Sequence, residues 1–172
     1  MLTCAGLMQA QHKPNVVIIF TDDQGYQDLG CYGSPLIQTP AIDGMAREGL
    51  KLTDFYVSAS VSSASRAGLL TGRLNTRNGV KGVFFPESEG MSSEEITLAE
   101  ALKEQGYATG CFGKWGMGYP GSGGEANKMG FDVFYGYNCQ RKAHSYYPEY
   151  LWNNQEKEYQ NGRYSQDAIH EH

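Results

Sequence analysis

The first hydrophobic segment of the chain is Asn15-Val16-Val17-Ile18-Ile19-Phe20, a continuous run that is rich in β-branched side chains. Such a run is typical of a strand that is buried on both faces, as in a largely parallel sheet. A polar turn follows at 21–25, and we expect two further strands at 52–57 and 107–112. The segment therefore predicts a strand of a buried sheet.

Helices are expected between these strands. Thr39 and Pro40 are residue types that favour an N-cap and a first helical position, and this helix should run to about Glu48. A second helix is expected at about 98–105, because Thr97 and Glu100 have the spacing of a capping box. The order of strands and helices predicts an α/β fold with a mostly parallel central sheet flanked by helices.

The composition argues against several classes of protein. The chain has 172 residues, of which 40% are hydrophobic and 19% are charged, as in a globular domain. Its net charge of -5 gives no general attraction for nucleic acid. No run approaches the ~20 apolar residues of a membrane span. The four cysteines form no C-x-x-C pair, which argues against a disulfide scaffold or a zinc site.

The two ends of the chain are expected to differ from its middle. Residues 1–12 resemble a residual secretion signal or a disordered leader, and residues 13–172 are expected to form one domain. From about residue 116 onward the sequence is rich in Gly, Tyr, Asn and Gln. We therefore expect a flexible loop at 118–124 and packed irregular structure at 146–152.

The segment Ser62-Ser63-Ala64-Ser65-Arg66-Ala67-Gly68 is the strongest candidate for a reactive site. Ser62 stands where a helix is expected to begin, and Arg66 lies one turn later with a side chain that leans back toward it. The N–H groups and the positive dipole end of a helix converge there, which suits an anion. The simpler alternative is that Ser62 is only an N-cap and Arg66 an ion-pair partner.

Asp22 and Asp23 form a second candidate site, directly after the first predicted strand. Adjacent side chains of a strand point to opposite faces, so both carboxylates reach one point only if the chain turns, which Gly25 permits. Two carboxylates at one point need a cation, and Ca²⁺ or Mg²⁺ suits such oxygen ligands. The alternative is an Asx-turn at the end of a strand.

Lys114 and His144 are two further candidates. Lys114 follows a predicted strand and could neutralise an anionic oxygen, or it could be an ordinary surface lysine. His144 lies among basic and aromatic residues and could protonate a leaving group, although most lone histidines have no such role. Because ligands bind beyond the carboxyl ends of parallel strands, the Asp pair, Lys114 and the Ser62 turn are expected at one edge of the sheet.

Several motifs, in order, resemble the N-terminal part of the type I, formylglycine-dependent sulfatases of the alkaline phosphatase superfamily. The resemblance covers about residues 14–165. Residues 14–33 are similar to the opening of that family, an apolar strand followed by T-D-D-x-G and D-x-G-x-Y-G. Residues 62–73 resemble the signature C-x-P-x-R-x-x-L-x-T-G-R, and residues 113–115 resemble its G-K-W motif. Residues 130–152 resemble a segment of bacterial arylsulfatase-like members.

The resemblance implies a sulfuric ester hydrolase that removes sulfate from a sulfated glycan or an aryl ester. It implies that Ser62 is oxidised to formylglycine. It also implies that Asp22, Asp23 and the modified Ser62 bind Ca²⁺, with Mg²⁺ as the other possible ion. The same alkaline phosphatase-like fold is implied, in an incomplete form.

Catalytic roles are implied as well. The hydrated aldehyde derived from Ser62 would attack sulfur, and Arg66 would hold that diol. Lys114 would contact the sulfate, and His144 would assist the departing alcohol. The metal and the guanidinium would supply the charge stabilisation that catalysis needs.

The chain departs from the family pattern in three ways. Ser62 and Ala64 stand where most members have Cys and Pro, which resembles the Ser-type variant that a radical-SAM maturating enzyme modifies. Gly116 stands where many members carry His. The later Asp-Asn metal pair and a second Lys are not found. We therefore expect a truncated bacterial product, periplasmic or secreted, with little or no activity of its own.

Two other functions stay open. Ser62 could act directly as a nucleophile on phosphate or phosphonate esters. Alternatively, the chain could be a non-catalytic remnant that binds an anion or a metal weakly.

Overall fold

The computed structural model describes residues 13–172, and the leader expected at residues 1–12 lies outside this part. The chain forms two compact units, Met1–Leu52 and Thr53–His172, and each is described by itself. Between residues 13 and 172, no helix has both the length and the apolar character that crossing a membrane requires.

The described part of the first unit contains three short helical elements: η1 (Tyr26–Asp28), η2 (Gly30–Tyr32) and α1 (Pro40–Glu48). Asp43, in the first turn of α1, accepts hydrogen bonds at Oδ1 from the backbone N–H of Cys31 at 2.6 Å and from the Thr39 hydroxyl at 2.9 Å. The Thr39 hydroxyl accepts one from the N–H of Gly30 at 2.8 Å. The predicted helix is therefore confirmed, with Thr39 at its N-cap and Pro40 as its first residue.

The predicted strand at 15–20 is wrong. This segment has no strand pairing, and its apolar side chains are exposed, with Val17 at 82% and Ile19 at 76%. A buried strand needs hydrogen-bonded neighbours, and no other strand occurs between residues 13 and 52 to supply them. The strand predicted at 52–57 is also wrong, and Tyr56 there is 74% exposed.

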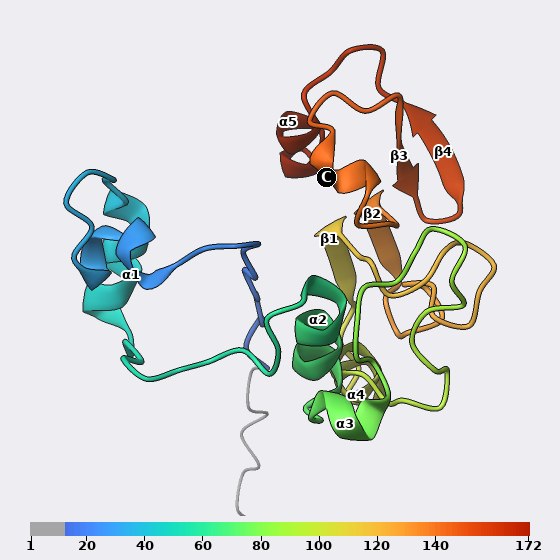
Figure 1. Ribbon diagram of the computed structural model, residues 1–172, viewed down its shortest axis with the longest axis horizontal. Helices are drawn as coiled ribbons and strands as arrows, with labels where there is room; N and C mark the ends of the chain where they lie inside the picture. Colours follow the sequence, from blue (N-terminus) through green and yellow to red (C-terminus); the bar gives the residue numbers. More distant parts are fainter. Residues whose placement is uncertain (1–12) are drawn as a thin grey trace, which may run out of the picture. The chain divides into compact units, whose positions relative to one another are not determined.

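The second unit contains a four-stranded sheet, drawn from yellow to red in Figure 1: β1 (Gly110–Lys114), β2 (Val133–Tyr137), β3 (Tyr150–Asn153) and β4 (Glu156–Tyr159), in that spatial order. The pair β1–β2 is parallel, whereas β2–β3 and β3–β4 are antiparallel. The α/β class is confirmed, and the described sheet is mixed. The strand expected at 107–112 begins only at Gly110, and the backbone N–H of Thr109 donates to the Asp132 carboxylate at 2.9 Å and not to a strand partner.

Strands β2, β3 and β4 were not expected from the sequence. β2 contains Gly136 with a φ of +150°, and a Cβ there would lie 2.0 Å from the carbonyl oxygen of Gly113 in β1. The two backbones can pair this closely only because the residue is glycine. The predicted loop at 118–124 is present, but it is packed against the core: Ser122 is buried and the Gly124 carbonyl accepts from Trp115 Nε1 at 2.9 Å.

Helices cover both faces of this sheet. The second unit contains α2 (Ser62–Thr71), α3 (Asn75–Asn78), α4 (Leu98–Glu104), η3 (Lys142–His144) and α5 (Ser165–His170). Phe134 of β2 packs in one core cluster with Ala64 and Ala67 of α2, whereas Tyr135 packs in another with Ala168 of α5. Because successive strand residues face opposite sides, α2 and α5 lie on opposite faces. The prediction of a sheet flanked by helices is thus confirmed.

The start of α4 is the predicted capping box. The Thr97 hydroxyl accepts from the backbone N–H of Glu100 at 3.2 Å, and the Glu100 carboxylate accepts from the N–H of Thr97 at 2.8 Å. The Thr97 hydroxyl also donates to the Met129 carbonyl at 2.7 Å, which ties the helix start to the segment before β2. A local sequence pattern therefore also fixes a tertiary contact.

Candidate functional site

The helix α2 begins at Ser62, as predicted. The N-cap is Val61, in extended conformation, and its side chain makes no capping hydrogen bond. The alternative in which Ser62 is only an N-cap is therefore wrong, because Ser62 is the first helical residue. An apolar N-cap leaves the positive end of the helix without a side-chain acceptor of its own.

Arg66 connects this helix start to the end of β1. Its Nε donates to the Ser62 hydroxyl oxygen at 3.3 Å, and its Nη1 donates to the Lys114 carbonyl at 2.7 Å. The predicted approach of Arg66 to Ser62 across one helical turn is confirmed. Both residues are half-buried, so the guanidinium charge is held beside the hydroxyl in a partly exposed position.

Ser63 fixes the backbone on the other side of the same helix start. Its side chain is fully buried, and its hydroxyl donates to the Gly116 carbonyl at 3.1 Å. The same oxygen accepts from the backbone N–H of Phe84 at 3.2 Å and from Gln140 Nε2 at 3.1 Å. Three separate segments thus meet at this one hydroxyl.

Gly116, where many members of the resembled family carry His, has a left-handed backbone conformation and lies beside the Gln140 side chain. It has a φ of +69°, and a Cβ at this position would lie 2.0 Å from Gln140 Nε2. The space that a side chain at position 116 would need is therefore taken by the Gln140 amide. Within residues 13–172, the Gln140 Oε1 atom is buried without a hydrogen-bond partner.

Lys114 lies at the last position of β1, as expected for a residue that follows the apolar part of a strand. Its carbonyl is held by Arg66, which places the residue next to the start of α2. Cys111, earlier in β1, is a thiol whose pKa is raised to about 12 by burial, against the opposing effect of the Arg66 charge. Cys111 is therefore protonated at neutral pH and is a poor nucleophile.

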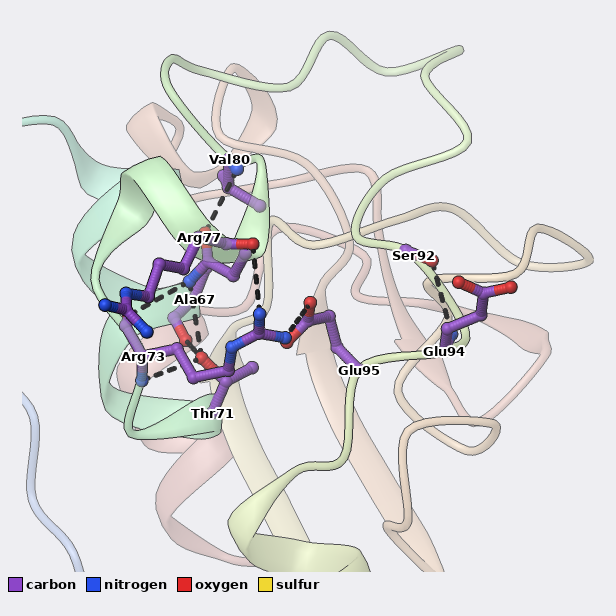
Figure 2. Close-up of polar contacts among 9 residues, drawn as sticks. Ala67, Thr71, Arg73, Arg77, Val80, Ser92, Glu94 and Glu95 are labelled. Atoms are coloured by element: carbon purple, nitrogen blue, oxygen red, sulfur yellow. Dashed lines mark hydrogen bonds and ion pairs between the residues drawn. The ribbon is translucent and has the colours of Figure 1, made fainter.

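The far end of the Ser62–Arg73 segment has a different role, shown in Figure 2. Arg73 Nη1 lies 2.5 Å from Glu95 Oε1, and Arg73 Nη2 donates to the Arg77 carbonyl at 3.2 Å. The Thr71 hydroxyl donates to the Ala67 carbonyl at 2.7 Å. The Glu95 side chain is only 10% exposed, so this ion pair is partly buried. These contacts hold α2, α3 and the segment before α4 together.

Asp22 and Asp23 lie in the first unit. Asp23 has a φ of +49°, in the left-handed region that Asp tolerates better than most residues. The predicted turn is thus made at Asp23 itself, whereas Gly25 has a φ of -88°. Because this unit is described by itself, the place of the Asp pair relative to Ser62 stays a prediction.

The described residues do not complete a metal site. Nowhere in residues 13–172 do three or more His, Cys, Asp or Glu side chains gather so that they could hold a metal ion. Asp22 and Asp23 offer two carboxylates of the kind that Ca²⁺ accepts, but Ca²⁺ takes about 6–8 oxygen ligands. The residues present therefore do not by themselves fit the ion.

His144 lies at the end of η3 and is exposed. The residue after it is tied to β2, because the Tyr137 hydroxyl donates to the Ser145 carbonyl at 2.6 Å. This contact holds the end of η3 beside the end of β2. The role of His144 in protonating a leaving group stays a prediction.

Sequence reasoning missed Ser63 and Gln140 as residues of the site. The two side chains are 77 positions apart and meet because the turn that follows β2 places Gln140 beside Ser63. The one available signal was that a polar residue, Ser63, stands among small residues directly after Ser62. That signal does not predict which residue the Ser63 side chain contacts.

The chain matches known sulfatases over nearly its whole length. Residues 14–171 match the family model described as Sulfatase. Human arylsulfatase A is 53% identical over 116 residues, which cover 66% of this chain and 23% of the relative. N-acetylgalactosamine-6-O-sulfatase of Bacteroides thetaiotaomicron is 40% identical, over 72% of this chain and 26% of the relative. This chain thus spans about a quarter of the length of these curated relatives.

A solved structure agrees with these matches. The crystal structure of Ps i-CgsB superimposes with a TM-score of 0.81 at 32% identity, and the match covers 91% of this chain and 39% of that one. The similarity therefore extends from the motifs to the path of the backbone.

Proposed function

The chain belongs to the sulfatase family, and from this premise we propose that it is part of an enzyme that hydrolyses sulfate esters at Ser62. The observation that carries the proposal is the arrangement at the start of α2. The Ser62 hydroxyl at the first helical position lies 3.3 Å from Arg66 Nε, and the same guanidinium donates to the main-chain carbonyl of Lys114, so a positive charge lies beside this oxygen at the end of β1.

Ser62 is proposed to be converted to formylglycine by a radical-SAM maturating enzyme of the Ser-type. The hydrated aldehyde supplies a nucleophilic hydroxyl and a second hydroxyl that drives release of sulfate. Arg66 holds the oxygen on this side chain in place and stabilises negative charge near it. Lys114 neutralises a sulfate oxygen as a point charge. His144 donates a proton to the departing alcohol.

Ca²⁺, or Mg²⁺ in its place, is proposed as the cofactor of the whole protein, with Asp22 and Asp23 among its ligands. No step is assigned to the ion, because the described residues do not complete its site. The proposed substrates are sulfated glycans or aryl sulfate esters, in line with the names of the relatives. The proposed location is the bacterial periplasm or the exterior of the cell.

The test is peptide mass analysis of protein from cells that carry a Ser-type maturating enzyme. The peptide that contains Ser62 should be lighter by two hydrogen atoms, and fragmentation should place the loss at Ser62. Ser65 of the same helix is the internal control and should remain unmodified. An unmodified Ser62 under these conditions would contradict the proposal and favour direct attack by the serine on phosphate or phosphonate esters.

A further inference from the structure

The chain contains two Asn-Gly pairs, Asn78-Gly79 and Asn161-Gly162. An asparagine that precedes glycine is prone to lose its side-chain amide without an enzyme, because glycine has no Cβ to shield its backbone nitrogen. That nitrogen attacks the Cγ of the asparagine and closes a succinimide ring. Both pairs have the same chemistry in sequence, and the fold decides which of them can react.

Asn78 is locked at the end of α3, where it is only 6% exposed. Its Nδ2 donates to the Arg73 carbonyl at 3.2 Å, and its Oδ1 accepts from the backbone N–H of Val80 at 3.0 Å. The nitrogen that would attack it belongs to Gly79, and this N–H donates to the Asn75 carbonyl at 3.1 Å. Ring closure at Asn78 therefore requires the end of α3 to open first.

Asn161 lies in the segment that joins β4 to α5 (Figure 1). Asn161 and Gly162 are both exposed, with φ values of +50° and +82°. A hydrogen bond from the backbone N–H of Arg163 to the Gln160 carbonyl, at 2.9 Å, closes the turn around them. The Asn161 side chain makes no hydrogen bond within residues 13–172. Solvent therefore reaches this pair, and contacts like those that lock Asn78 are missing.

We propose that Asn161 is a site of spontaneous deamidation and that Asn78 is protected from it. The Gly162 nitrogen loses its proton to hydroxide and bonds to Asn161 Cγ, the bond from Cγ to Nδ2 breaks, and ammonia leaves. Water then opens the succinimide. Opening at Cγ gives aspartate, and opening at the backbone carbonyl carbon gives isoaspartate. The overall change is uptake of water, release of ammonia and a new negative charge in the turn.

The two products differ in their effect on the fold. Isoaspartate routes the main chain through the side chain and so adds a methylene to the backbone of the turn. The turn lies between two buried residues. Gln160 Nε2 donates to the Tyr135 hydroxyl at 3.1 Å, and the N–H of Ser165 donates to the Tyr146 carbonyl at 2.8 Å. A longer backbone between these two anchors displaces one of them, so isoaspartate should loosen α5, whereas aspartate should not.

The test is peptide mass analysis of the full chain after incubation at mildly alkaline pH. The peptide with Asn161 should become heavier by about one mass unit, at least about tenfold faster than the peptide with Asn78, because Asn78 reacts only through local opening. Incubation in concentrated urea is the control, and there the two rates should agree within about twofold, since glycine follows both asparagines in the unfolded chain. Comparable rates in the folded chain, or an Asn161 that reacts only in urea, would overturn the proposal.

Matched variants separate the chemistry from its effect on α5. Asn161→Ser removes the reactive amide, and its peptide mass should stay unchanged. Asn161→Asp supplies the aspartate product without isoaspartate, and Asp tolerates a positive φ. The readout is hydrogen exchange of the buried Ala168 amide, which donates to the Tyr164 carbonyl at 3.2 Å. Exchange should be about tenfold faster in the purified isoaspartate form than in Asn161→Asp or the fresh chain. Equal exchange in all three would overturn the assigned effect on α5.

Discussion

The two ends of α2 use the same kinds of residue for different purposes. At its start, Arg66 donates to the Ser62 hydroxyl and to the main-chain carbonyl of Lys114. At its end, Arg73 pairs with Glu95, a carboxylate that is almost buried. Arg66 thus connects the start of a helix to the end of β1, whereas Arg73 pairs with a carboxylate and holds neighbouring segments together.

In this one continuous motif, the half with Ser62 and Arg66 is the proposed reactive half, and the half with Arg73 makes a structural ion pair. Sequence similarity over the whole motif does not separate the two roles, because each role depends on which residues the arginine side chain contacts in the folded chain. Substitutions of Arg73 and Arg66 test this division, and a substitution of Lys103 gives an exposed ion pair for comparison; the largest expected effect comes first.

Arg73→Ala should lower the free energy of unfolding by about 2–3 kcal/mol, because it leaves the Glu95 carboxylate, with 10% side-chain exposure, without its cation. Urea unfolding followed by circular dichroism measures the loss. Arg77→Ala is the control: its side chain is exposed, and the change should stay within about 0.5 kcal/mol. Equal stability of the two variants would show that the end of α2 is not held by this ion pair.

Arg66→Ala should weaken binding of inorganic sulfate at the start of α2 about tenfold, because a charge-assisted contact is lost. The measurement is a titration with sodium sulfate at constant ionic strength, followed by the backbone amide signals of Ser62 and Ser63. Folded Arg73→Ala should bind sulfate as the unchanged chain does. If both arginine variants lose sulfate affinity equally, the two halves of the motif are not separate.

The exposed ion pair between Lys103 and Asp132 should have the smallest effect. The hydrogen bond from Lys103, followed by that from the Thr109 backbone, holds the pKa of Asp132 below its usual range. A pKa that is lower in the folded state stabilises the fold above the unfolded pKa, and this contribution is lost as the pH falls through the folded pKa.

Lys103→Ala should therefore destabilise the chain slightly at neutral pH and not at all once Asp132 is protonated. Urea unfolding between about pH 7 and about pH 3 measures this convergence. A carboxyl titration of Asp132 by NMR should show its pKa rising in the variant. A difference in stability that persists unchanged at acid pH would contradict the assignment to this pair.

Local sequence patterns correctly predicted the elements that depend on interactions between residues close together in the chain. The capping box at Thr97 and the Thr39–Pro40 helix start occur as expected, since cap geometry involves residues only a few positions apart. The segment at 15–20 failed for the opposite reason. Its composition indicates that it can be buried, but burial requires neighbouring strands, and these are not found in residues 13–52.

The sequence by itself determined the family, the start of α2 at Ser62 and the reach of Arg66 across one turn, because motif order and helical periodicity are properties of the chain alone. Tertiary structure alone decided that Ser63 contacts Gln140, that Arg73 pairs with Glu95, and that the Asn138 Nδ2 atom is buried without a hydrogen-bond partner among residues 13–172. These contacts join residues that are far apart in the chain. Their energies depend on how deeply the side chains are buried and on which partner each one contacts, and a local sequence pattern predicts neither.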